Sequence, residues 1–235
     1  FVDFYSKNNI SPVSQDISDL KKHFQRRDSL LRSLGIPKIL VSNAEILEFG
    51  PGSGHNATYI ASLKPSKYHL VDGNIKGVED TKRLLCEYNV DDFKVIHSLF
   101  LEYQTDNLYD IVWAEGCIPH QSDPISIVKH LSSYTKKDGI FVASMNNGVS
   151  VLTETIRRVA SFMYLNESDT FQDKLDTIRP LLKGHLLNIK GMSRPVDDWI
   201  ADSIINPQHE TKLFSIPDAI AALENGYDIY STSSK

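Results

Sequence analysis

Short apolar runs alternate with amphipathic segments over the first 145 residues of the chain. Short apolar runs predict buried strands, and apolar positions that recur at helical spacing predict helices. The expected strands are residues 46–49, 67–71, 93–97, 109–114 and 140–145. The expected helices between them are residues 56–63, 75–88 and 125–134. This order predicts an α/β fold with a doubly wound, mostly parallel, Rossmann-like sheet, helices on both faces and right-handed crossovers.

Helical patterns dominate the two ends of the chain. Residues 1–10 have an irregular pattern, and a helix is expected over residues 14–34, where Gly35 and Pro37 end it. After the fifth strand the expected elements are helices at 149–165, 170–187, 194–202 and 216–223, then a sixth strand at 227–232. The pattern therefore divides the chain into an N-terminal helical segment (1–40), a Rossmann-like core (41–148), a helical insertion (149–212) and a final helix and strand that complete the sheet (213–235).

Composition narrows the class of protein. The 235 residues are 41% hydrophobic and 23% charged, with a formal net charge of −5, which gives no basic footprint for nucleic acid. Cys86 and Cys117 are the only cysteines and have no metal-ligand spacing, so neither a disulfide framework nor a metal site is expected. No long apolar segment or signal-like start is present, so no membrane partner is expected and the cytoplasm is the expected location.

The first expected strand runs into a turn of closely spaced glycines. The sequence E-x-G-x-G-x-G places Glu48 before Gly50, Gly52 and Gly54. Glycine permits positive φ and leaves no Cβ between the backbone and a ligand, and the helix that follows presents free N–H groups. His55 stands where a dinucleotide fingerprint needs its third glycine. The turn therefore predicts a nucleotide-type cofactor other than a dinucleotide. The alternative is that the glycines are needed only for the backbone conformation of the loop, without a ligand.

With its preceding acid, this turn resembles motif I of the class I S-adenosylmethionine-dependent methyltransferases. The resemblance implies that S-adenosyl-L-methionine is the cofactor and S-adenosyl-L-homocysteine the product. It also implies that Glu48 holds the amino end of the cofactor, usually through water. The family usually has a seventh, antiparallel strand, and no segment before Lys235 has that pattern.

Polar residues follow the later expected strands as well. Asp72 lies 18 positions after Gly54, close to the interval at which a carboxylate accepts hydrogen bonds from ribose hydroxyls, and Gly73 and Asn74 follow it. The alternative for Asp72 is an ordinary turn residue at a strand end. By resemblance to the family, Ser98 and Leu99 after the third strand meet the adenine ring, although the acidic residue usual there is absent.

Glu115 and Gly116 leave the fourth expected strand, in a segment that resembles motif IV of the same family. In open α/β sheets ligands bind at the carboxyl ends of the strands. We therefore expect Glu48, Asp72, Ser98 and Glu115 to converge on one crevice.

Fewer sequence features indicate which residues bind or deprotonate the methyl acceptor. His120, in the loop after the fourth strand, is the candidate general base or substrate contact, because imidazole titrates near neutral pH. Resemblance to the family implies that the N-terminal segment covers the cofactor, with Tyr5, Arg26 and Arg27 at the pocket. The alternative is a docking helix with a solvated charged face.

The resemblance also implies that residues 149–212 form a lid that binds the acceptor. Arg194 and Trp199 are the candidates there, since Arg194 suits an anionic acceptor. The alternatives are that Trp199 fills the lid core and that Arg194 pairs with Asp197 or Asp198.

These features predict transfer of a methyl group to O or N of a small polar metabolite, either neutral or anionic. The stretch 194–207 is similar to one group of bacterial small-molecule methyltransferases linked to surface-polysaccharide building blocks. Two alternatives stay open: an NAD(P)-dependent oxidoreductase or epimerase, against which His55 and the lack of a Tyr-x-x-x-Lys pair argue, and a non-catalytic cofactor-binding subunit. A homodimer is an open possibility.

Overall fold

The computed structural model describes residues 2–11, 14–119, 121–207, 213–223 and 226–233. Five strands form one parallel sheet in the order β3-β2-β1-β4-β5. Their bounds are β1 Glu45–Phe49, β2 Lys67–Asp72, β3 Asp92–His97, β4 Tyr109–Ala114 and β5 Thr135–Ala143. The doubly wound α/β fold predicted from the sequence is confirmed.

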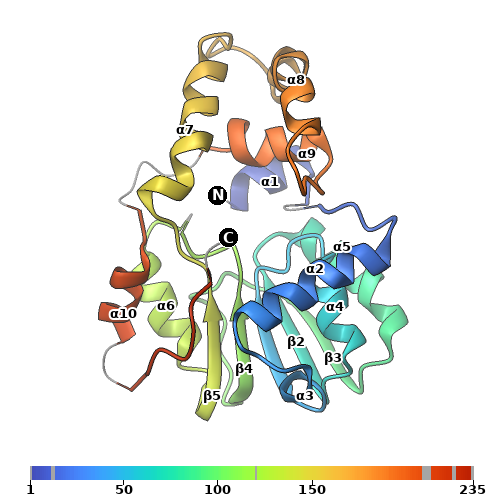
Figure 1. The fold of residues 1–235 in the computed structure, drawn as a ribbon, viewed down its shortest axis with the longest axis vertical. Helices are drawn as coiled ribbons and strands as arrows, with labels where there is room; N and C mark the ends of the chain where they lie inside the picture. The colour runs from blue at the N-terminus through green and yellow to red at the C-terminus, as the bar shows by residue number, and fades with distance from the viewer. Residues whose placement is uncertain (1, 12–13, 120, 208–212, 224–225, 234–235) are drawn as a thin grey trace.

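Helices cover both faces of this sheet, and a helical cap sits above its upper edge in Figure 1. The helices of the core are α2 Leu20–Ser33, α3 Lys38–Val41, α4 Ala57–Ser62, α5 Ile75–Leu85 with the 3₁₀ turn η1 Cys86–Tyr88, α6 Pro124–Ser132 and α10 Ile216–Leu223. The helices of the cap are α1 Val2–Asn8, α7 Gly148–Phe162, α8 Phe171–Leu187, α9 Val196–Ile200 and the π turn η2 Ala201–Ile205.

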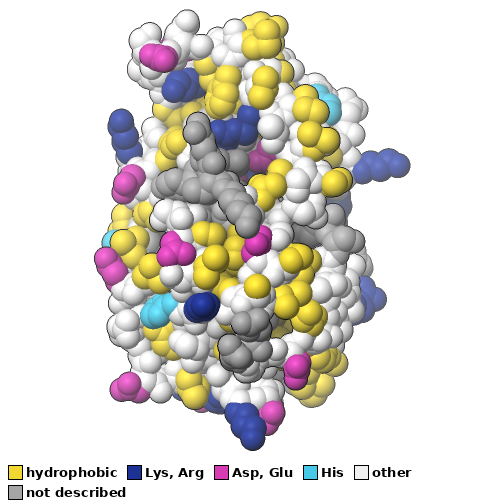
Figure 2. Space-filling view, turned by 90° about the vertical axis from the view of Figure 1, so that its left-hand side faces the viewer, with side chains coloured by type: hydrophobic (Ala, Val, Ile, Leu, Met, Phe, Trp, Pro, Cys, Tyr) yellow, Lys and Arg dark blue, Asp and Glu magenta, His cyan; other side chains and the backbone are white. Residues whose placement is uncertain are grey.

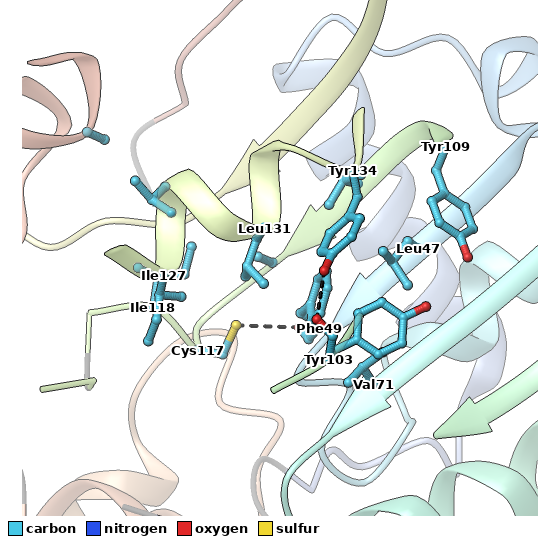
Figure 3. Packing of buried hydrophobic residues seen from close by; sticks show 14 of the residues in the cluster. Leu47, Phe49, Val71, Tyr103, Tyr109, Cys117, Ile118, Ile127, Leu131 and Tyr134 are labelled. Atoms are coloured by element: carbon cyan, nitrogen blue, oxygen red, sulfur yellow. Dashed lines mark hydrogen bonds between the residues drawn. The ribbon is translucent and has the colours of Figure 1, made fainter. Parts of the chain in front are cut away.

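The central strands supply two cores because successive side chains on a strand point to opposite faces. On β1, Ile46 packs on the face covered by α2, α4 and α5, whereas Leu47 and Phe49 pack on the face covered by α6 and α10. In Figure 3, Ile127 and Leu131 of α6 point toward this second face. Strands buried on both faces explain why the sequence shows continuous apolar runs there.

The cap has a separate small core. Leu175, Ile178 and Leu186 of α8 pack against Ile200 and Ile204, and the cluster shares no residue with the two cores of the sheet. Figure 1 shows α7 leaving the upper end of β5 and α1 lying under α9, so the cap stands over the carboxyl ends of the strands. This is where an open α/β sheet binds its ligands.

The structure corrects three details predicted from the sequence. Residues 2–8 form a helix, not an irregular segment, with Tyr5 buried. The long N-terminal helix starts only at Leu20, because Asp19 caps it by accepting a hydrogen bond from Lys22 N. The fifth strand starts at Thr135, before the expected start at residue 140, and Asp138 adopts a positive φ of 63° inside it at a register shift.

The expected sixth strand is also wrong, since residues 227–233, all within the described ranges, form no strand. Side chains fix this segment instead: the Tyr227 hydroxyl donates to Ser132 O at 2.6 Å and the Tyr230 hydroxyl donates to Gly35 O at 2.7 Å. Ile229 is 61% exposed, so the alternation that predicted a strand does not bury an apolar face.

Among the helices that the structure describes, none combines the length and the apolar character that a membrane crossing requires.

We expect Leu131→Ala to lower the free energy of unfolding by about 2–5 kcal/mol, because Leu131 is fully buried between α6 and the sheet and its removal leaves a cavity. Leu108→Ala is the control, since Leu108 is 47% exposed and its change is expected to stay within about 0.5 kcal/mol. Urea denaturation of the two variants measures both values, and equal losses would contradict the assignment of the core.

Candidate active site

The glycine turn between β1 and α4 is a backbone cradle. Gly50, Gly52 and Gly54 have φ values of 69°, 58° and 78°, which side-chain-bearing residues rarely adopt. A Cβ on Gly50 would lie 2.7 Å from Cys117 Cβ, and one on Gly54 would lie 2.8 Å from Thr81 Cα. The glycines are therefore required both by the backbone conformation and by the close approach of α5 and the loop after β4.

Asp72, at the end of β2, holds the cradle in place. One carboxylate oxygen accepts from Gly52 N at 2.9 Å and the other from Asn74 N at 2.8 Å. The side chain is 6% exposed, and this burial raises its pKa to about 6 although the two backbone hydrogen bonds oppose the shift. Each carboxylate oxygen has a second lone pair, so Asp72 keeps the capacity to accept from two further hydroxyls.

Glu48 ends β1 on the face covered by α2. It is 5% exposed and accepts a hydrogen bond from the Tyr68 hydroxyl on the neighbouring strand. Burial raises its pKa to about 7, while the Tyr68 hydrogen bond and the nearby Arg27 charge act in the opposite direction. Glu48 is thus poised to change its charge near neutral pH.

Glu115, after β4, is held by α2. Arg27 donates from both terminal nitrogens to the two carboxylate oxygens, at 3.1 and 2.7 Å, and Trp113 Nε1 donates at 3.2 Å. This bidentate geometry fixes the direction of both side chains. Arg27 is buried, so the alternative that α2 exposes a solvated charged face is wrong at this residue. Arg26 is half-buried beside His23.

Three carboxylates near these strand ends influence one buried thiol. Burial raises the pKa of the Cys117 thiol, and the charges of Asp72, Glu48 and Glu115 raise it further, because all three carboxylates lie within electrostatic reach of this one sulfur. With Arg27 as the cation paired to Glu115, the cluster is rich in negative charge when its carboxyls are ionised.

The residues expected at the adenine end adjoin the same edge. Ser98 N donates to Asp72 O at 3.1 Å, and a Cβ on Gly73 would meet Leu99 Cδ2 at 3.1 Å. The Ser98 hydroxyl donates to Leu99 O at 3.0 Å, which leaves its lone pairs free to accept. Ser98 also borders a hollow of about 520 Å³ along the outer strand β3, away from the glycine cradle.

Asn74 and Gly116 have local structural roles. The Asn74 side chain caps α5 by accepting from Lys76 N at 2.8 Å and Gly77 N at 3.2 Å. Gly116 has a φ of 75°, and its N–H donates to the Ser144 hydroxyl after β5. Nothing lies within 4 Å of a Cβ built on Gly116, so the space beside it is open.

The N-terminal segment ties the cap to the cradle. Asn74 Nδ2 donates to Ile10 O at 3.1 Å, and Gln15 N donates to His55 Nδ1 at 2.9 Å. On the cap side, the Ser193 hydroxyl donates to Gln15 Oε1 at 2.6 Å. Gln15 is therefore held by the core and by the cap at the same time, and Ile10 is held by the core.

Three of the residues predicted to bind the acceptor make contacts within the cap. The Tyr5 hydroxyl donates to Asp202 and accepts from Asn206 Nδ2 at 2.9 Å, and Arg194 Nη1 donates to the other oxygen of Asp202 at 2.9 Å. Arg194 therefore pairs with Asp202, not with the carboxylates of Asp197 or Asp198, and Trp199 packs against the cap core. His120 lies outside the described residues. The roles of these four residues stay predictions.

Several residues of the site were missed by sequence reasoning. Tyr68 and Trp113 bind Glu48 and Glu115, and Thr81 donates its hydroxyl to Gly52 O at 3.0 Å. A signal for one of them was present: Trp113 lies two residues before Glu115, so the two side chains leave the same face of the strand. Tyr68 and Thr81 carry no such signal, because their partners lie on other elements.

The geometry fits one cofactor class. A glycine turn with positive φ values, a buried carboxylate at the end of the next strand and an acid on the first strand form the arrangement expected for a class I S-adenosylmethionine-dependent methyltransferase. A family model described as a methyltransferase domain matches residues 21–176. The chain belongs to this methyltransferase family.

Individual relatives are more distant. The Ribosomal RNA small subunit methyltransferase A of Pelagibacter ubique is 34% identical over 70 residues, which cover 30% of this chain and 25% of that protein. Two structures of PKMT2 from Rickettsia typhi, one in complex with AdoHcy, have TM-scores of 0.52 and 0.53 at 19% and 18% identity. They cover 73% and 74% of this chain, which matches only 34% of their length, and they show a shared fold.

Metal binding has no support in the described parts of the chain, where no group of three or more His, Cys, Asp or Glu side chains has the geometry to hold an ion.

We expect Gly54→Ala to lower the free energy of unfolding by about 1–3 kcal/mol, because alanine is strained at this positive φ and its Cβ meets the α5 backbone. Gly184→Ala in α8 is the matched control: its Cβ meets nothing within 4 Å, and the same substitution there is expected to stabilise by about 0.5–1 kcal/mol. Thermal unfolding of both variants compares them, and a stable Gly54→Ala protein would contradict the strained cradle.

We expect the contribution of Glu48 to stability in the ligand-free protein to be lost as pH rises from 4.5 to 7. Folding raises the pKa of Glu48, so the folded state holds a proton that the unfolded state releases above its own pKa near 4.5. The raised pKa of Glu48 contributes about 3 kcal/mol to the free energy of unfolding. This contribution is fully present below pH 4.5 and is lost as pH rises through 7.

Glu48→Gln should flatten this part of the pH profile, whereas Glu79→Gln, at an exposed position on α5, should leave it unchanged. Urea denaturation at several pH values gives the profiles. The burial argument fails if wild type and Glu48→Gln have the same slope.

Proposed function

We propose that the chain transfers a methyl group from S-adenosyl-L-methionine to an oxygen or nitrogen of a small polar metabolite. The observation that carries the proposal is the meeting of Glu48, Asp72 and Glu115 with the glycine cradle at the carboxyl edge of the sheet, directly under the helical cap. The cofactor site and the acceptor site then share one edge, as methyl transfer requires.

Charge favours this cofactor over a dinucleotide. S-adenosylmethionine carries a sulfonium and an ammonium, whereas the pyrophosphate of NAD is anionic. The three carboxyls of the edge lie near the Arg27 guanidinium, which is already paired with Glu115. Opposite charges attract strongly at such buried sites, and a pyrophosphate would meet like charge there. His55 in place of the third fingerprint glycine argues in the same direction.

The residues of the chain contribute binding and orientation. When bound, the cofactor supplies an activated methyl group on its sulfonium centre. Asp72 would accept from ribose hydroxyls through its spare lone pairs, and Glu48, when ionised, would hold the amino group. The N-terminal segment, bound to Asn74, His55 and the cap, would exclude water and keep the acceptor aligned with the methyl group.

The acceptor side belongs to the cap in this proposal. Arg194 forms an ion pair with Asp202. An anionic acceptor would therefore have to bind Arg194 in competition with Asp202. We therefore propose a polar acceptor without requiring an anionic group, and His120 as the candidate base only for acceptors that must lose a proton.

An RNA acceptor is the second possibility, favoured by the 70-residue match to a ribosomal RNA methyltransferase. The net charge of −5 opposes it, because proteins that bind nucleic acid neutralise phosphates with clusters of Lys and Arg.

We expect S-adenosylhomocysteine to raise the thermal unfolding midpoint in a concentration-dependent way, because a ligand of the native state stabilises it, and NAD to leave it unchanged. Differential scanning fluorimetry with both ligands makes the comparison. Stabilisation by NAD alone would reject the proposed cofactor.

A matched pair of variants locates the site. Asp72→Asn, at the carboxyl end of β2, should weaken S-adenosylhomocysteine binding by about 1–3 kcal/mol in titration calorimetry. Asp92→Asn, at the opposite end of the sheet beside His69, should bind like wild type. Radiolabelled methyl transfer to amines, amino alcohols, phosphorylated sugars and RNA then identifies the acceptor class, and binding without transfer to any of them would favour a non-catalytic subunit.

A further inference from the structure

Helix α7 has its apolar side turned outward. Val149, Ile156, Val159 and Met163 are 84%, 59%, 61% and 81% exposed, and Leu152 is 55% exposed. Figure 2 shows hydrophobic side chains gathered on the upper part of this face of the molecule, where α7 lies. An ordinary surface helix places its apolar stripe toward the core, so α7 is inverted.

The polar side of α7 faces the cap and fixes this orientation. Arg158 Nη1 donates to Ser203 O at 3.2 Å and to Asn206 O at 3.0 Å, and Ser161 is buried. Arg157 donates to His185 Nε2 at 3.1 Å and lies 5.7 Å from the Trp199 ring centroid. Because these contacts anchor the polar side, α7 cannot rotate its apolar side inward without losing them.

The exposed side chains repeat as a coiled-coil seam. Positions 149, 152, 156, 159 and 163 are separated alternately by three and four residues, which is the a/d spacing of a heptad. Val149, Ile156 and Met163 take the a positions, and Leu152 and Val159 take the d positions, so every a and d position of the segment is apolar. The spacing is symmetric about Ile156 to within one residue, so the seam is complementary to itself.

The flanks of the seam carry no charge. Thr153, Thr155, Ala160 and Phe162 border it, whereas the charged residues of the helix, Glu154, Arg157 and Arg158, are all half-buried on the cap side. Two copies can therefore approach along α7 without like-charge repulsion. A membrane surface would be expected to need Lys and Arg on the flanks, and these positions have none.

The exposed apolar area can be compared with that of a dimer core. Counting Phe162 and Tyr164 with the five seam residues, the exposed apolar side chains offer about 270–540 Å² at roughly 60–120 Å² per fully exposed side chain. A standard interface buries about 800 Å² per partner, of which about 65% is apolar in homodimers, or about 500 Å². The upper part of the α7 range reaches the apolar core of one such interface.

We propose that the chain forms a two-fold symmetric dimer in which α7 packs against α7 of a second copy, with Ile156 at the centre of the seam against Ile156 of the partner subunit. The proposal rests on the inverted helix and its heptad spacing, and it does not depend on the proposed methyl transfer.

Analytical ultracentrifugation of the full chain tests the proposal. We expect a species of twice the 26.5 kDa chain mass for wild type and the single-chain mass for Ile156→Glu and for Val159→Lys, with unchanged thermal unfolding of the monomer. Ile39→Glu is the matched control, because Ile39 is 75% exposed on α3 at another surface and should leave the dimer intact. A wild-type monomer at the highest soluble concentration, or a dimer that both α7 variants retain, would overturn the proposal.

Cross-linking locates the contact. In a Cys86→Ser background, which removes the exposed thiol, Ile156→Cys should give a disulfide-linked dimer on addition of a disulfide oxidant, while Ile39→Cys should stay monomeric on denaturing gels. Absence of the Ile156→Cys cross-link, or pelleting of a monomeric wild type with neutral lipid vesicles, would reject a second copy as the occupant of the α7 face.

Discussion

The burial of carboxylates at the carboxyl edge of the sheet is the constraint on which the site depends. Asp72 and Glu48 lie where solvation is poor, so each needs donors: two backbone N–H groups for Asp72 and the Tyr68 hydroxyl for Glu48. Glu115 obtains its donors from α2 and β4, through Arg27 and Trp113. Satisfying these acids orders the glycine turn, the start of α5 and the position of α2, so the electrostatics of the edge also organise the local fold.

The order of strands and helices in the core was predictable because each element is buried on both sides or on one continuous face. β2, β4 and α10 fall within one or two residues of the segments predicted from periodicity. Prediction was wrong where long-range contacts decide. The 227–233 segment alternates like a strand, but Tyr227 and Tyr230 bind backbone carbonyls of distant elements, and α1 forms where the sequence shows only scattered aromatics, because Tyr5 is buried against the cap.

The site was predictable to the extent that it lies at strand ends. Glu48, Asp72 and Glu115 follow recognisable strands, and parallel topology brings them together. Their partners were not predictable in the same way, because Arg27 and Glu115 are 88 residues apart and nothing local pairs them. Asn74 shows the opposite case: a residue assigned to the cofactor also caps α5 and binds Ile10, two roles that only coordinates reveal. The family match through residue 176 extends the assignment beyond the glycine motif.

The contacts of Ile10 and Gln15 couple the two halves of the molecule through very few bonds. Asn74 donates to Ile10 O, and Gln15 joins His55 of the cradle to Ser193 of the cap. These hydrogen bonds are far fewer than those that hold the sheet together, so they can break by local opening while the sheet stays intact. The cap and the cradle are therefore linked by an element whose opening frequency a single loosened bond would change without affecting the core.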